Sequence, residues 1–239
     1  TMEDKLLKDL ILNSLREDIG DGDHSSLACI SDVDYGKAKL LIKQTGILAG
    51  VRVAKEIFHT VDSELQLKIF TSDGSSVKNG DVPLHVSGRV LSILKSERLV
   101  LNIMQRMSGI ATSTNEYASK LNGLKTKILD TRKTTPGFRF LEKEAVRIGG
   151  GENHRMGLYD MIMLKDNHID YSGGIKNAIS RTIDYLKRKN LDLRIEIEAR
   201  SLKDIEIILD TGGVDRIMLD NFTIENTAAA VRLINGRFE

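Results

Sequence analysis

The feature of this sequence that most restricts its fold is a set of four short apolar runs in the second half, each followed at once by ionisable residues. The runs are residues 127–129, 161–164, 195–197 and 217–219. Apolar residues at helical spacing predict helices at residues 174–188, 201–210 and 223–234, each of which follows one of the runs. Strands that alternate with helices in this way predict a parallel sheet wrapped by helices, as in an α/β barrel.

Polar side chains with strong functional groups come directly after each run. They are Asp130, Arg132 and Lys133, then Lys165, Asp166 and Asn167, then Glu198 and Arg200, and finally Asp220 and Asn221. In a parallel barrel the carboxyl ends of all strands face the same way, so these groups are expected at one mouth, where active sites of this architecture lie. The alternative is that they only mark where strands meet solvent. Repeated ionisable pairs, in place of Gly, Ser and Asn, favour a site.

The third run predicts a strand with two carboxylates on one face. Alternation puts Ile195 and Ile197 on one side and Glu196 and Glu198 on the other. If helices cover the isoleucines, both carboxylates point into the barrel, where they are costly unless paired with a cation or bound to a metal. The alternative is an edge strand whose glutamates face solvent.

Two loops supply positive charge. Residues 130–139 read DTRKTTPGFR, and residues 149–155 read GGGENHR. Arg suits bidentate binding of carboxylate or phosphate, Lys is a compact charge and His can donate a hydrogen bond. Three consecutive glycines allow a close approach to a ligand or a positive φ, although a simple turn explains them equally. The signatures of nucleotide-binding loops and of zinc sites are absent from the sequence.

The first hundred residues predict an α+β domain with its own sheet. Apolar residues at helical spacing indicate a helix over residues 3–18, and residues 91–121 indicate another, interrupted near Gly109. Strands are expected within residues 36–51 and 65–70 and through Val86, with a helix at residues 52–59.

Composition limits the class of protein. Lys and Arg total 35 against 34 Asp and Glu, a net charge of +1, so there is no basic excess of the kind that nucleic-acid or membrane-surface proteins carry. No apolar stretch is long enough to span a bilayer. The single Cys29 cannot form an internal disulfide, and a reduced, cytoplasmic location is the simplest interpretation.

The motifs and their order resemble the quinolinate phosphoribosyltransferases. The resemblance covers the chain from about Glu17 to its end, and DTRKTTPG and GGGxNHR are its most specific parts. The matching segments are EDIGDGDHSS (17–26), GILAG (46–50), ERLVLN (97–102), SGIAT (108–112), DTRKTTPG (130–137), GGGENHRMGLYD (149–160), LKDNH (164–168), IEIEA (195–199) and LDNF (219–222).

This resemblance implies a two-domain fold and a reaction. The fold is an N-terminal open-faced α/β sandwich with a leading helix, residues 1–108, followed by an incomplete (β/α) TIM-like barrel, residues 109–239. The reaction joins quinolinate to phosphoribosyl pyrophosphate with Mg²⁺ and yields nicotinate mononucleotide, pyrophosphate and CO₂ in NAD biosynthesis. In the family, an SGGI strand-loop and a further strand-loop form the ribose 5′-phosphate site, and both would lie beyond Glu239. We therefore expect the natural protein to continue past Glu239. The residues of the 5′-phosphate site stay unassigned.

Residue roles also follow from the resemblance. Quinolinate carboxylates are expected on Arg132, His154, Arg155 and Lys165. Lys133 is expected near the pyrophosphate or the reacting carboxylate. The ribose hydroxyls and Mg²⁺–pyrophosphate are expected on Glu198 and Asp220, and the catalytic set is Lys133, Lys165, Glu198 and Asp220. In a homodimer, Arg98 would enter the site of the partner subunit.

Three other functions stay open on the residues alone. A nicotinate-type or molybdenum-associated phosphoribosyltransferase could share the barrel, although the four cationic groups favour a dicarboxylate substrate. A Schiff-base lyase could use Lys165. A non-catalytic protein could bind quinolinate without turnover.

Overall fold

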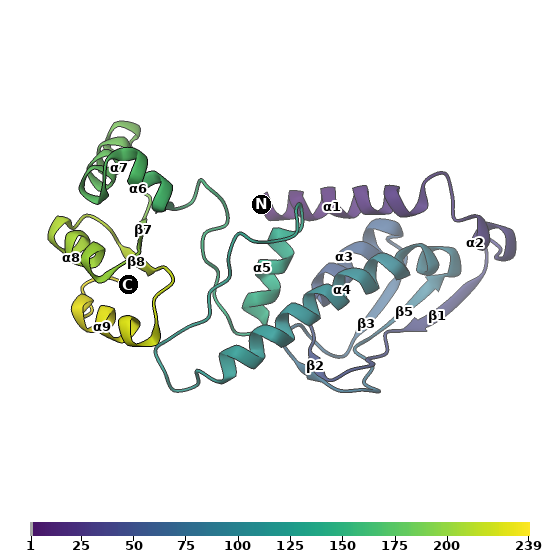
Figure 1. Cartoon of the computed structure of the whole chain (residues 1–239). Coiled ribbons are helices and arrows are strands. Elements are labelled where there is room, and N and C mark those ends of the chain that lie inside the picture. Colours follow the sequence, from purple (N-terminus) through teal and green to yellow (C-terminus); the bar gives the residue numbers. More distant parts are fainter. Residues whose placement is uncertain (1) are drawn as a thin grey trace. The chain divides into compact units, whose positions relative to one another are not determined.

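The computed structural model describes residues 2–239, which form two compact units (Figure 1). The first unit ends at His154 and the second spans Arg155–Glu239. The predicted domain boundary after residue 108 lies inside a continuous helix, α4 (Val90–Ser119), and it stays a prediction about the family's domain organisation.

The first unit contains an antiparallel sheet of three strands in the order β1-β5-β3. These strands are β1 (Tyr35–Lys39), β5 (Leu84–Arg89) and β3 (Gln66–Ile69), and a short pair is formed by β2 (Gly46–Ile47) and β4 (Ser76–Val77). Along β5, Leu84 and Val86 are buried whereas His85 between them is exposed, so only one face of the sheet meets the core. This is the open-faced sandwich that the sequence predicts.

Helices cover that face of the sheet. They are α3 (Val51–Val61) and α4, with the leading helix α1 (Met2–Ile19) packed against both; α2 (His24–Cys29) follows α1 (Figure 1). The amphipathic α1 places Leu7 and Ile11 in the core. The prediction of a helix over residues 3–18 is therefore confirmed.

The helix α4 is uninterrupted, so the predicted break near Gly109 is wrong. Glycine in a helix interior costs about 1 kcal/mol relative to alanine. The opposite face of α4 compensates for this cost, because Met104, Met107 and Ala111 are buried against the core on either side of Gly109. Packing of that buried face outweighs the local preference of a single exposed glycine.

The first of the four predicted strands does not form as a regular strand. Leu129 makes one isolated parallel bridge with Glu152. The amide of Glu152 donates to the carbonyl of Ile128 at 2.8 Å, and the amide of Asp130 donates to the carbonyl of Glu152 at 3.1 Å. This bridge brings the two positively charged loops of the sequence to one place, and helix α5 (Arg139–Ile148) connects them.

The second unit contains a parallel sheet in the order β6-β7-β8. The strands are β6 (Ile162–Leu164), β7 (Ile195–Ala199) and β8 (Arg216–Leu219), and they match three of the four predicted runs. The helices are α6 (Asp166–Ser172), α7 (Ile175–Lys189), α8 (Leu202–Thr211) and α9 (Ile224–Ile234) (Figure 1). A core of aliphatic side chains, with Ile197 and Ile205 fully buried, joins the sheet to these helices.

Glu196 resolves the question raised by the paired carboxylates of β7. Its side chain is fully buried, and its Oε2 accepts a hydrogen bond from Nη1 of Arg216 on β8 at 3.2 Å. Arg216 and Arg194 both pair with Glu239, and their hydrogen bonds lower the pKa of that carboxyl. The buried carboxylate of Glu196 is thus paired with a cation from the neighbouring strand, as its cost of burial requires.

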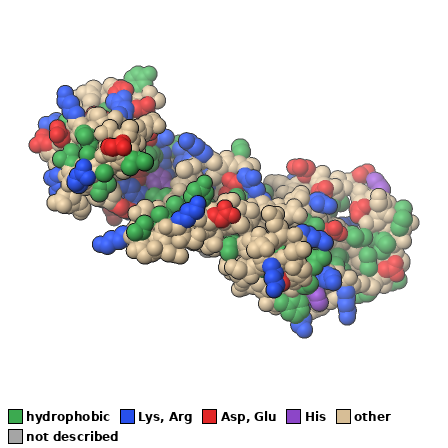
Figure 2. All heavy atoms as spheres, turned by 60° about the horizontal axis from the view of Figure 1, so that its bottom comes forward, with side chains coloured by type: hydrophobic (Ala, Val, Ile, Leu, Met, Phe, Trp, Pro, Cys, Tyr) green, Lys and Arg blue, Asp and Glu red, His purple; other side chains and the backbone are tan. Residues whose placement is uncertain are grey.

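Positive and negative side chains are interspersed on the surface. Figure 2 shows Lys and Arg mixed with Asp and Glu on the visible face of each unit, in keeping with the net charge of +1. No helix within residues 2–239 is both long enough and apolar enough to cross a membrane. Because the overall charge is balanced and mixed over the surface, attraction for an anionic ligand must come from particular side chains.

Candidate active site

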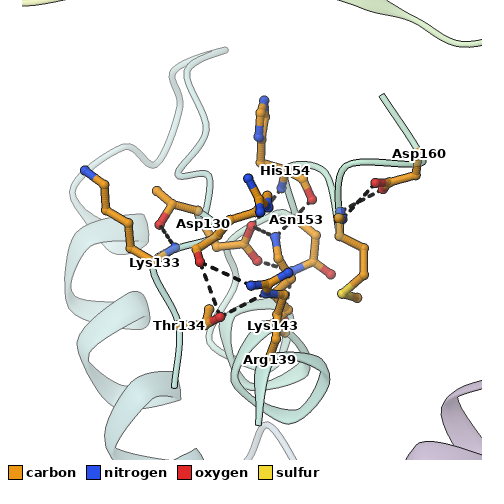
Figure 3. Close-up of polar contacts among 12 residues, drawn as sticks. Asp130, Lys133, Thr134, Arg139, Lys143, Asn153, His154 and Asp160 are labelled. Atoms are coloured by element: carbon orange, nitrogen blue, oxygen red, sulfur yellow. Dashed lines mark hydrogen bonds and ion pairs between the residues drawn. The ribbon is translucent and has the colours of Figure 1, made fainter. Parts of the chain in front are cut away.

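A buried ion pair lies at the centre of the candidate site in the first unit. Nζ of Lys143, on α5, contacts Oδ1 of Asp130, which directly follows the apolar run 127–129 (Figure 3). The side chains are only 1% and 7% exposed. Oδ2 of Asp130 accepts a second hydrogen bond from Nδ2 of Asn153, which also donates to the carbonyl of Lys143 at 2.8 Å. Every charge in this cluster is matched and hydrogen-bonded, as a buried pair must be.

The same pair holds the backbone of His154. The amide of His154 donates to Oδ1 of Asp130 at 2.8 Å, and its carbonyl accepts from Nζ of Lys143 at 3.0 Å. In Figure 3 the imidazole ring of His154 points away from the pair. The backbone of this residue is therefore held from both sides while its side chain faces outward.

A second set of contacts holds the loop that carries Arg132 and Lys133. Nε of Arg139, at the start of α5, donates to the hydroxyl of Thr134 at 2.9 Å. Glu142 accepts from the amide of Thr135 at 3.1 Å and from Arg106 at 2.7 Å. Although burial alone raises the pKa of Glu142, the hydrogen bonds from Arg106 and Thr135 hold it below its usual value. Glu142 therefore stays ionised and keeps the loop attached to α5.

The cationic residues on this loop are placed differently. Arg132 is half-buried, and its Nε is buried without a hydrogen-bond partner among residues 2–239. Lys133 is exposed, and its side chain projects away from the cluster (Figure 3). A buried guanidinium nitrogen without a partner is costly, and an anionic ligand at Arg132 would relieve that cost.

The triple glycine serves packing within the first unit. A Cβ on Gly149 would overlap the carbonyl oxygen of Ala111 on α4 and lie 2.8 Å from Cβ of Thr114. A Cβ on Gly151 would lie 2.9 Å from Cγ2 of the same threonine, and Gly150 has a φ of 95°. The glycines therefore allow the loop that leads to His154 to lie directly against α4.

We expect Gly149→Ala to destabilise the protein by about 3 kcal/mol, because the added methyl group meets backbone that cannot move aside. The measurement is the free energy of unfolding in urea. Gly109→Ala is the matched control, because a Cβ there meets nothing within 4 Å and the position is helical. That variant should be as stable as the original or slightly more so. Equal stability of Gly149→Ala and the original protein would contradict the packing role.

Three predicted residues come to one edge of the sheet in the second unit. Lys165 follows Leu164, the register partner of Ile197, so it lies level with Glu198. Asp220 lies two residues beyond Met218, the register partner of Glu198. Glu198 is half-buried and its Oε2 accepts from the amide of Asp166 at 3.3 Å. The expected convergence at the carboxyl ends is thus confirmed within this unit.

The two remaining predicted residues are Arg155, which directly follows His154, and Arg98 on α4. Arg155 begins the second unit and is buried, and its Nη1 donates to the carbonyl of Met161 at 3.4 Å. Arg98 lies in the first unit on an exposed position of α4. Of the predicted residues, the first unit therefore carries Arg98, Arg132, Lys133 and His154, and the second carries Arg155, Lys165, Glu198 and Asp220.

Sequence reasoning assigned no anchoring role to the residues that hold the loops of the first unit. It did not single out Arg106, Glu142 and Lys143. It noted Arg139 and Asn153 only as members of the two loops, and Asp130 only as a residue after a strand. One signal was available, because Arg139, Glu142 and Lys143 lie at helical spacing i, i+3 and i+4 directly after the DTRKTTPG motif.

Comparison with known proteins covers almost the whole chain. Residues 23–108 match the quinolinate phosphoribosyl transferase N-terminal domain, and residues 110–239 match the C-terminal domain of the same family. The chain belongs to the quinolinate phosphoribosyltransferase family. The predicted family and the phosphoribosyltransferase class of enzyme are thereby confirmed.

Individual relatives agree with this assignment. The chloroplastic nicotinate-nucleotide pyrophosphorylase [carboxylating] of Arabidopsis thaliana is 45% identical over 98% of this chain and 71% of its own length. Quinolinate phosphoribosyltransferase [decarboxylating] 1 of Nicotiana glauca is 43% identical over 98% of this chain and 70% of its own. The crystal structure of NadC from Streptococcus pyogenes superposes with a TM-score of 0.92 at 40% identity, covering 98% of this chain and 81% of that one. The last likeness confirms the fold class.

Proposed function

We propose that this protein transfers the phosphoribosyl group of phosphoribosyl pyrophosphate to quinolinate with decarboxylation, giving nicotinate mononucleotide, pyrophosphate and CO₂ in NAD biosynthesis. Family membership over both matched domains supports the reaction. The observation that carries the substrate assignment is the pair of anchored loops in the first unit that bear Arg132, Lys133 and His154. A dicarboxylate and a polyphosphate both require such a cationic site.

The proposed roles divide between binding and charge stabilisation. Arg132, His154, Arg155 and Lys165 hold the carboxylates of quinolinate, and Lys133 lies near the pyrophosphate or the reacting carboxylate. Glu198 and Asp220 serve the ribose. The pyridine nitrogen attacks C1 of the ribose while the bond between C1 and pyrophosphate breaks. Nearby carboxylates stabilise the positive charge that develops on the sugar.

Decarboxylation then follows from the chemistry of the product. Ribosylation makes the pyridine nitrogen positive. When the adjacent carboxylate leaves as CO₂, the electron pair of the broken bond stays on that ring carbon, where the neighbouring positive charge stabilises it. A proton then replaces the lost group on the ring. This step needs no organic cofactor, and the side chains of the protein have only to orient the ring and balance its charge.

Glu198 and Asp220 have the oxygen donors that suit Mg²⁺. Among the described residues no group of three or more His, Cys, Asp or Glu side chains could hold a metal by itself. Two carboxylates on neighbouring strands nevertheless fit an ion that keeps several waters and binds mainly through substrate phosphates. Mg²⁺ bound there would offset the negative charge of pyrophosphate.

A homodimer and a cytoplasmic location complete the proposal. Arg98 is exposed on α4. In the proposed dimer each subunit presents this residue to the active site of the other. The location stays a prediction from the single Cys29.

The substrate assignment is tested by comparing quinolinate with nicotinate. We expect quinolinate to bind at least tenfold more tightly, because nicotinate lacks one carboxylate and leaves side chains of the proposed site without a partner. Isothermal titration calorimetry measures both affinities. The variant Arg132→Ala provides the control, since it should weaken quinolinate binding more than nicotinate binding. Equal affinities, or tighter nicotinate, would refute the assignment.

A further inference from the structure

The buried cation of α5 has no assigned part in the reaction. Lys143 is 1% exposed, and among the described side chains it is the largest that is almost fully buried. Burying an ammonium group is expensive, and even when it is paired, an apolar side chain of similar volume is often equally stable or better. The contacts of Lys143 therefore need an explanation beyond stability.

Those contacts converge on one residue. Nζ of Lys143 donates to the carbonyl of His154 at 3.0 Å, and its partner Asp130 accepts from the amide of His154 at 2.8 Å. The pair thus fixes both peptide groups that flank the Cα of His154. Rotation about the backbone of this residue would break a charge-assisted hydrogen bond on one side or the other.

A third side chain closes the arrangement. Asn153 donates from Nδ2 to Oδ2 of Asp130 and to the carbonyl of Lys143 (Figure 3). It immediately precedes His154, so it connects helix α5, the loop after residue 129 and the loop that ends at His154. The whole arrangement lies within the first unit.

We propose that Lys143 is a positioning residue for quinolinate binding, and that it acts by fixing the backbone of His154 through its pair with Asp130. This inference rests on the proposed role of His154 in holding a quinolinate carboxylate. Lys143 itself does not touch the substrate. Displacing a binding group by about 1 Å can cost up to a hundredfold in rate, so loss of this support should be visible in kinetics.

The test is Lys143→Met, which keeps much of the length of the side chain and removes its charge and hydrogen bonds. We expect the KM for quinolinate to rise at least tenfold, whereas the KM for phosphoribosyl pyrophosphate changes less than threefold. A purely structural role would lower the amount of active enzyme without this difference between the substrates. A folded variant in which both KM values stay within twofold of the original, or rise equally, would overturn the proposal.

Glu144→Gln is the matched control. Glu144 is the next residue of α5 and forms an ion pair with Arg52 at 2.7 Å, away from the loops of the site. This variant also removes one charge from an ion pair of the same helix. It should leave the KM for quinolinate unchanged, and a tenfold rise in that variant would show that any damage to α5 has the same effect.

A milder variant covers the case in which Lys143→Met does not fold. Asn153→Ala removes hydrogen bonds to Asp130 and to the carbonyl of Lys143 without leaving a buried charge unpaired. We expect a selective rise of about threefold or more in the KM for quinolinate, in the same direction as for Lys143→Met. An unchanged KM in the folded Asn153→Ala protein would count against the proposal.

A double-variant cycle separates this inference from the proposed function. If His154→Ala alone leaves quinolinate binding unchanged, the assignment of His154 fails. If His154→Ala weakens binding and Lys143→Met has less than a threefold effect in that background, Lys143 acts through His154. A tenfold effect of Lys143→Met in both backgrounds would show that it acts elsewhere.

Discussion

Mixing inactive Arg98→Ala protein with inactive Lys165→Ala protein should restore formation of nicotinate mononucleotide. In the proposed dimer, each site takes Arg98 from one subunit and Lys165 from the other. Both defects of a mixed dimer then fall on the same site, and the second site is whole. With complete exchange of equal amounts, half of the dimers are mixed, so about a quarter of all sites are intact.

The physical reason for a contribution in trans is exclusion of water. A cation over the mouth of a polar site removes solvent and strengthens every charge interaction within it. Sequence alone also allows Arg98 to act on its own subunit. In that case each site of a mixed dimer carries one lesion, and no activity returns.

A second mixture provides the control. Arg132→Ala mixed with Lys165→Ala should stay inactive, because both residues are proposed to serve the site of their own subunit. Activity is measured before and after exchange, and native mass spectrometry of subunits that carry different tags verifies the exchange. Persistent inactivity of the first mixture despite verified exchange, or recovery of activity in the second, contradicts the assignment in trans.

Glu198→Gln and Asp220→Asn should each lower Mg²⁺-dependent turnover by at least tenfold while quinolinate binding survives. Both residues lie at the carboxyl edge of the parallel sheet in the second unit. Each change keeps the shape of the side chain and removes the charge that is proposed to stabilise the transition state and the bound ion. The loss of one such electrostatic contact costs about a hundredfold to a thousandfold in well-studied cases.

The measurement is kcat as a function of Mg²⁺ concentration, together with calorimetry of quinolinate. Glu206→Gln is the control, because this exposed residue of α8 carries the same charge in the same unit away from the strand ends. Its kcat should match that of the original protein. If kcat of Glu198→Gln and of Asp220→Asn equals that of the unsubstituted protein, these carboxylates only mark where the strands meet solvent.

Much of the fold of the second unit could be predicted because its pattern is local. An apolar run followed by an amphipathic helix specifies a strand and its crossover within about thirty residues. Three runs became β6, β7 and β8, and Lys165, Glu198 and Asp220 came to one edge simply because parallel strands end together. The family itself was recognisable from its motifs and their order.

The sequence by itself therefore determined the family, the alternation of strands and helices, and which residues follow the strands. Tertiary structure alone decided that α4 runs through Gly109, that Gly149 lies against Ala111, and that Lys143 is buried on Asp130. The physical reason is range. A helix period or a turn is encoded by neighbours in the chain, whereas burial, close packing and the partner of a charge depend on segments that meet only after folding.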